Sequence, residues 1–132
     1  MTDFDLDIDV EWKRGRSPAA FASKMVLFKK RLGSELEQAM QESVLWVERD
    51  AKQFAPVDTG TLRASIASMV EGTVKDEIRG YIGSNVSYAL FQEMGTSKMD
   101  ANPFIMPAVE KNRERILQRF RTAVQDAADG LF

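Results

Sequence analysis

The stretch of residues 55–63 constrains the fold most, because a helical pattern ends there and an alternating pattern begins. Pro56 has no backbone N–H and disfavours helical geometry at the residue before it, so a helix arriving from the N-terminal side should end near Phe54. Gly60 permits a positive φ. The side chain of Asp58 can accept hydrogen bonds from nearby backbone N–H groups. We therefore predict a corner of fixed shape at this point of the chain.

Composition favours one globular domain and excludes several kinds of chemistry. The 132 residues fit a single domain (1–132), and 44% hydrophobic with 29% charged residues is typical of a folded chain. The sequence contains no Cys and no His, which excludes thiol nucleophiles, Ser-His triads and the commonest zinc ligands. The longest apolar run, 104–109, is too short to cross a bilayer. We expect no cofactor, no metal site and no membrane contact.

Residues 1–16 are predicted to form an N-terminal strand arm. Acidic and apolar residues alternate strictly, which is typical of a strand with one apolar and one acidic face. Residues 1–11 hold five acids and no base, whereas residues 107–121 hold five bases against two acids. The apolar positions of the arm are Phe4, Leu6, Ile8, Val10 and Trp12. The bases near the C-terminus are Lys111, Arg113, Arg115, Arg119 and Arg121.

A long helix should follow the arm. Ser17 and Pro18 form a good helix start, and the apolar residues beyond them step mostly by three or four as far as Phe54. A continuous helix over this range would be about 55 Å long at 1.5 Å per residue, which exceeds what a small domain can cover. We therefore expect either one long helix or a break near Gly33, with Ser34 capping a second helix.

After the corner the sequence predicts a β-hairpin and a short helical turn. Residues 62–67 and 74–82 alternate in polarity on either side of a turn at 71–73, which is the pattern of two antiparallel strands. Residues 88–94 have the pattern of a short helix, and Gly95 can close it.

The last part of the chain predicts a loop and a C-terminal helix. Residues 96–102 are polar, Pro103 bends the chain inward, and Pro107 is placed to start a helix that runs to Gly130. The fold class is therefore α+β, a single domain in which an antiparallel sheet packs against the long N-terminal helix and the C-terminal helix.

A longer motif is more specific than any of these elements alone. It begins at the corner and continues through Gly80-x-Ile82-Gly83. It then includes residues 88–96, Tyr-Ala-x-Phe-x-Glu-x-Gly-Thr, and ends at residues 103–108, Pro-Phe-Ile-x-Pro-Ala. This order and spacing resembles the neck or tail-completion proteins of long-tailed DNA bacteriophages, of the minor tail component type, over about residues 40–115. The motif positions are Pro56, Asp58, Gly60, Leu62, Arg63, Ile66, Gly83, Tyr88, Phe91, Glu93, Gly95, Thr96, Pro103, Phe104 and Pro107.

The resemblance implies a structural virion protein with no catalytic activity. Such a protein would form a homo-oligomeric ring at the head–tail junction and join the connector, on the portal side, to the tail tube. It would be found in the virion and, during assembly, in the host cytoplasm. Its partners would be other copies of itself and the connector-side and tail-tube proteins. Separately, the five bases near the C-terminus suggest non-specific contact with DNA in the channel.

The residues themselves favour structural roles for the motif. Leu62, Ile66, Ile82, Phe91 and Phe104 are expected in the core. Arg63 and Glu93 are placed to pair across the hairpin and the short helix.

Two unlike charged segments suggest how copies could meet in a ring. The acidic arm could contact the basic C-terminal helix of the next copy, or add to the edge of its sheet. The opposite arrangement, in which arm and helix pack within one chain, is an equal alternative. The candidate subunit contacts are Phe4, Leu6, Ile8, Val10, Trp12, Arg113 and Arg121.

The tripeptide 58–60 leaves one enzymatic alternative. Asp-Thr-Gly and the later segment 81–85 resemble elements of retroviral-type aspartic proteases, in which a homodimer places two aspartates about 3 Å apart to share a proton. Asp58 would be the catalytic residue. That family is almost entirely strand, however, whereas helical patterns cover about half of this chain.

Overall fold

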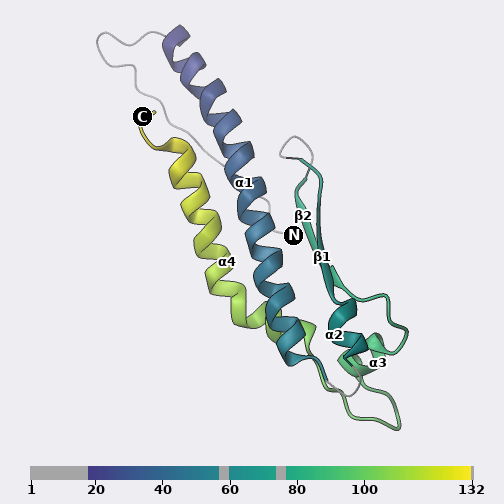
Figure 1. Cartoon of the computed structure of the whole chain (residues 1–132). Helices are drawn as coiled ribbons and strands as arrows, with labels where there is room; N and C mark the ends of the chain where they lie inside the picture. The colour runs from purple at the N-terminus through teal and green to yellow at the C-terminus, as the bar shows by residue number, and fades with distance from the viewer. Residues whose placement is uncertain (1–17, 57–59, 74–76, 132) are drawn as a thin grey trace.

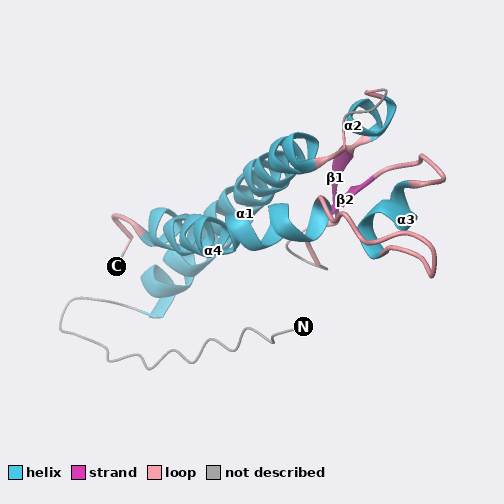
Figure 2. Ribbon diagram, turned by 90° about the horizontal axis from the view of Figure 1, so that it is seen from below, coloured by secondary structure: helices cyan, strands magenta, loops and turns pink. Residues whose placement is uncertain are grey.

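The computed structural model describes residues 18–56, 60–73 and 77–131, so the predicted arm and Asp58 lie outside the described residues. Two long antiparallel helices lie side by side, a β-hairpin lies along the first of them, and two short helices gather where the first long helix ends (Figures 1 and 2). The elements are α1 (Pro18–Phe54), α2 (Thr61–Ser65), β1 (Ala67–Glu71), β2 (Arg79–Gly83), α3 (Ala89–Met94) and α4 (Ile105–Ala128). The predicted α+β class is confirmed.

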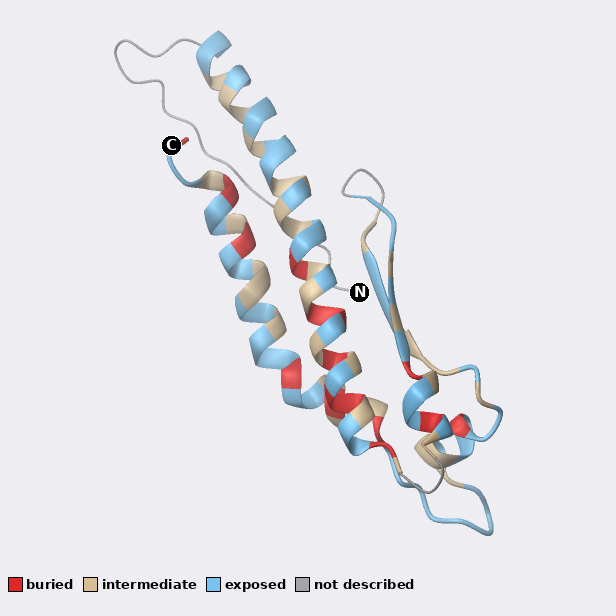
Figure 3. Ribbon diagram, viewed as in Figure 1, coloured by how far each residue is buried: buried red, intermediate tan, exposed pale blue. Residues whose placement is uncertain are grey.

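Helix α1 ends at Phe54, as Pro56 predicts, but it runs without interruption through Gly33. Of the two alternatives, one long helix is confirmed and the break near Gly33 is wrong. One glycine inside a helix costs only about 1 kcal/mol relative to alanine, which good helix formers on both sides can offset. The helix can be this long because its first part extends past the end of α4 (Figure 3).

Residues 61–65 form helix α2 and not the start of the predicted strand 62–67. Gly60 has a φ of 76°, which turns the chain out of the corner, and the Ser65 hydroxyl donates to the Leu62 carbonyl at 2.6 Å. Leu62 and Ile66 are 3% and 2% exposed. Their spacing of four fits one helical turn as well as it fits two strand periods, so a segment this short could not distinguish the two.

The hairpin packs closely on α1 because β2 has a glycine at the contact. Strands β1 and β2 pair antiparallel, with Met69 opposite Tyr81. A Cβ atom on Gly80 would lie 2.5 Å from Val44 Cγ1 and 2.7 Å from Met40 Sδ. Only a residue without a side chain allows this approach.

The buried core lies at the end of α1, where α2, α3 and the start of α4 meet it (Figure 3). Leu62, Ile66 and Phe104 are buried, as predicted, and Ile82 is half-buried against the cluster. Phe91 is 50% exposed, so its assignment to the core is wrong. Helix α3 is short and buries Ala89, which leaves Phe91 facing outward. Within the described ranges, no helix has the length and apolar content needed to cross a bilayer.

We predict that Gly80→Ala destabilises the protein by about 1–3 kcal/mol, because the new methyl group overlaps Val44 and Met40 and forces the hairpin away from α1. Urea denaturation followed by circular dichroism measures the change. The matched control is Gly83→Ala in the same strand, where an added Cβ meets nothing within 4 Å; it should change stability by less than about 0.5 kcal/mol. Equal losses in the two variants would refute the close contact at Gly80.

Candidate functional site

The Glu93 carboxylate caps the N-terminus of α4. Its Oε2 accepts hydrogen bonds from the backbone N–H groups of Phe104 at 2.7 Å and Ile105 at 3.1 Å, and its Oε1 accepts one from Met106 at 2.8 Å. The first N–H groups of a helix have no partner inside the helix and carry partial positive charge. One side chain from α3 therefore satisfies three donors and fixes where α4 begins.

Arg63 does not pair with Glu93, and that prediction is wrong. Its Nε donates to the carbonyl of Lys52 at 2.9 Å, in the last turn of α1. The final carbonyls of a helix lack partners inside it and favour a cationic donor. Of the charged motif residues, the two that the structure describes bind the ends of different helices, Arg63 at the C-terminus of α1 and Glu93 at the N-terminus of α4.

Gly95 ends α3 and turns the chain, so that the following loop comes back beside α3 and places the start of α4 within reach of Glu93. Its N–H donates to the Phe91 carbonyl at 2.7 Å, its φ is 75°, and a Cβ there would lie 2.7 Å from the backbone nitrogen of Ala101. The N–H of Asn102 then donates to the Gln92 carbonyl at 2.7 Å. The glycine is needed both for its conformation and for the close return of the loop.

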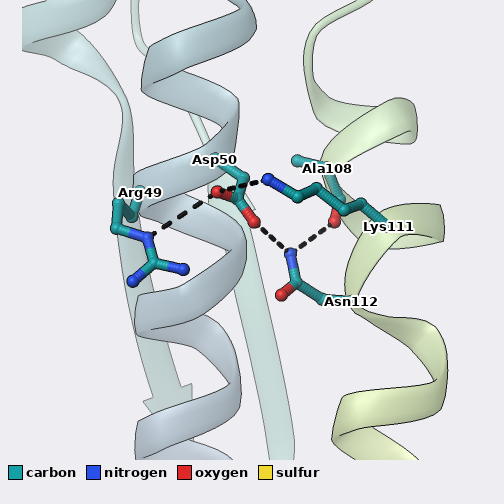
Figure 4. Close-up of polar contacts among 5 residues, drawn as sticks. All are labelled: Arg49, Asp50, Ala108, Lys111 and Asn112. Atoms are coloured by element: carbon teal, nitrogen blue, oxygen red, sulfur yellow. Dashed lines mark hydrogen bonds and ion pairs between the residues drawn. The ribbon is translucent and has the colours of Figure 1, made fainter.

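Asp50 forms a buried polar cluster between α1 and α4 (Figure 4). It is 1% exposed; its Oδ2 accepts a hydrogen bond from Asn112 Nδ2 at 2.7 Å, and its Oδ1 lies 3.4 Å from Lys111 Nζ and 3.6 Å from Arg49 Nε. Asn112 Nδ2 also donates to the Ala108 carbonyl at 2.8 Å. The cluster orients the two long helices at the level of the core.

Burial alone would raise the pKa of Asp50. The hydrogen bonds from Asn112 and Lys111, and the charges of Lys111 and Arg49, outweigh this effect and hold the pKa below its ordinary value of 3.8. Sequence analysis missed the cluster. The signal was an Asp on the apolar stripe of α1 and an Asn on that of α4, since a polar residue at a core position needs a partner.

The basic side chains of α4 are largely engaged within the chain. Lys111 pairs with Asp50, Arg113 with Glu110 and Arg119 with Glu42, while the Arg115 guanidinium lies 3.8 Å from the centre of the Trp46 ring. Arg121 is exposed and has no ion pair within the described ranges. The basic face predicted for this helix is therefore used mainly to hold α4 against α1.

A set of large apolar side chains is exposed on α3 and the first turn of α4. We call these residues the α3 apolar surface; Met94 is the most exposed, at 73%. Because Glu93 binds the N–H of Met106, the first turn of α4 is held beside α3. Exposed apolar patches on otherwise polar molecules commonly mark contact sites. The α3 apolar surface consists of Tyr88, Leu90, Phe91, Met94 and Met106.

The outer face of the hairpin is a second, unlike surface. Met69 and Tyr81 are paired in register and exposed, and they line an open groove of about 640 Å³ together with Ser65 and Ser84, whose hydroxyl oxygens lie 2.5 Å apart. No carboxylate lines this groove. Across the described ranges, no three potential metal-ligating side chains come together.

A comparison with protein-family models found one match, to the model described as "Bacteriophage HK97-gp10, putative tail-component", over residues 19–95. The matched range begins at the start of α1 and ends at the glycine after α3, so it includes the corner, Arg63 and Glu93. No curated protein and no solved structure matched the chain.

We predict that Asp50→Asn lowers the free energy of unfolding by about 1–3 kcal/mol at neutral pH, because Lys111 loses its acceptor charge. The depressed pKa means that this stabilisation is present above the pKa of the unfolded Asp and is lost as pH falls through the folded pKa. The gap between wild type and variant should therefore shrink as the pH falls below the ordinary Asp pKa of 3.8 and through the lower pKa of the folded protein.

Urea denaturation at several pH values tests this, with Asp100→Asn, a change of an exposed loop carboxylate, as the control. The control should follow the wild type at every pH. A gap for Asp50→Asn that does not vary with pH would contradict the assigned charge state.

Proposed function

Because the chain belongs to the HK97-gp10-like family of bacteriophage tail components, we propose that it forms a homo-oligomeric ring at the head–tail junction and joins the connector to the tail tube. The family itself indicates a structural, tail-associated virion protein. The single observation that carries the proposal is the family match, which includes the motif positions from Pro56 to Gly95.

The surfaces of the domain are consistent with a ring. Closed rings use heterologous contacts, in which one patch of a subunit meets a different patch on the next. The chain has two unlike exposed patches, the α3 apolar surface and the outer face of the hairpin, held on one rigid core. A ring also leaves two axial faces, which suits a protein that must meet a connector on one side and a tail tube on the other.

The arm is proposed to help join neighbouring copies through Phe4, Leu6, Ile8, Val10 and Trp12. Of the two basic contacts expected on α4, Arg121 stays a proposed contact, whereas Arg113 would reach a neighbour only as a pair with Glu110. The protein would act in the virion, after assembling in the host cytoplasm.

Contact with DNA in the channel is the weaker part of the proposal. Four of the five α4 bases already have partners in the chain. Phosphate binding grows at low salt, so an absence of filter-retained DNA at low salt would remove this contact.

The aspartic protease alternative finds less support than a structural role. The described residues are mostly helical, with one two-stranded sheet, whereas the protease fold is built from strands. The family match also points to a tail component. Casein cleavage at acid pH that is lost in Asp58→Asn would be the result that favours the protease.

We predict that the purified full-length protein forms ring-shaped particles. Light scattering should give a mass several times that of one chain, and negative-stain images should show a closed ring with a central opening. A truncated chain lacking residues 1–14 should assemble more weakly if the arm joins copies. A full-length protein that stays monomeric at every concentration tested would contradict the ring.

A further inference from the structure

Helix α1 projects beyond α4. Arg31 Nη1 donates to the Asp129 carbonyl at 3.2 Å, which places the end of α4 level with Arg31. Residues 18–30, about 20 Å of helix at 1.5 Å per residue, extend further (Figures 1 and 3). None of them is buried.

The face of α1 that packs on α4 continues along this projection. Glu42, Trp46 and Asp50 are spaced by four and each contacts a side chain of α4, so they define the packed face. The same helical spacing, carried back toward the N-terminus, meets an unbroken apolar row. We call this row the extension stripe; it consists of Phe21, Met25, Phe28 and Leu32.

Lys24 and Arg31 lie on one side of the extension stripe and Lys29 on the other, and no acid accompanies them. Between residues 12 and 34 the sequence contains no Asp or Glu. Lys24, Lys29 and Lys30 have no ion pair within the described ranges, and Arg31 donates to a backbone carbonyl. The projection is thus an apolar stripe with a strongly positive border. It fits a partner that is apolar on one face and acidic on the other.

Residues 3–12 of this chain have that chemistry. Their acids alternate with five apolar residues, and the segment 4–12, if extended, spans about 26 Å at 3.3 Å per residue. The extension stripe covers about 17 Å of helix. The acidic segment is therefore long enough to cover the whole stripe.

We propose that residues 4–12 of one copy pack along the extension stripe of the neighbouring copy. The apolar side chains lie on the stripe, and the long side chains of the flanking bases reach around to the carboxylates. The inference rests on the proposed ring, in which a contact must join unlike surfaces of adjacent copies. In this arrangement the arm contacts α1 of the neighbouring copy and not its α4, because most bases of α4 already have partners within their own chain.

Single-cysteine variants test the contact, since the sequence has no native Cys. Full-length chains carrying Leu6→Cys, Ile8→Cys or Val10→Cys are each mixed in denaturant with Met25→Cys chains, refolded together and oxidised. Mass spectrometry then measures the disulfide between the two different chains. The control replaces Met25→Cys by Val26→Cys, one residue along but turned away from the stripe.

At least one arm variant should give about fivefold more mixed disulfide with Met25→Cys than with Val26→Cys, because a disulfide needs Cβ atoms about 4 Å apart. Adding Lys24→Glu should lower that yield several-fold, and Lys52→Glu, at the other end of α1, should not. Equal yields at positions 25 and 26, or no mixed disulfide, would overturn the inference.

Light scattering of the same samples separates this inference from the ring itself. Ring-sized particles without a mixed disulfide would refute the arm contact and leave the ring standing. Monomers without a mixed disulfide would refute both.

Discussion

The position of α4 beside α3 depends on one carboxylate that binds the start of a helix. Glu93 accepts three backbone hydrogen bonds at the N-terminus of α4, and these bonds connect α3 to a helix that begins after a loop. The same contact brings Phe104 into the core and sets Met106 beside α3. A carboxylate is well suited to this position because it adds full negative charge to the positive end of the helix.

Local backbone preferences predicted where helices end and where the chain turns, whereas contacts between distant segments decided the partners and the burial of side chains. The end of α1, the turn at Gly60 and the closure of α3 at Gly95 follow from the backbone preferences of Pro and Gly. The partners of Glu93 and the Asp50 cluster depend on segments far apart in sequence, so spacing alone could not assign them. The same is true of Phe91, whose exposure depends on which side of α3 meets the core.

The charged residues of the motif region act on backbone geometry and packing. Arg63 and Glu93 satisfy helix ends, and Asp50 holds the two long helices in register. The exposed surfaces proposed for partners are mainly apolar: the α3 apolar surface and the outer face of the hairpin. Exposed apolar area of this kind suits a building block of a larger particle.

The most direct test of this account measures assembly and folding together in Glu93→Ala. Loss of the cap should cost about 1–2 kcal/mol of stability, which leaves the chain folded in mild conditions but frees the α3 apolar surface from its fixed position. We predict a helical circular dichroism signal like that of the wild type, with ring-sized particles lost by light scattering. Glu114→Ala, which removes another exposed carboxylate from the same helix, should assemble normally. If Glu93→Ala assembled as well as the wild type, the claim that this cap shapes the assembly surface would be contradicted.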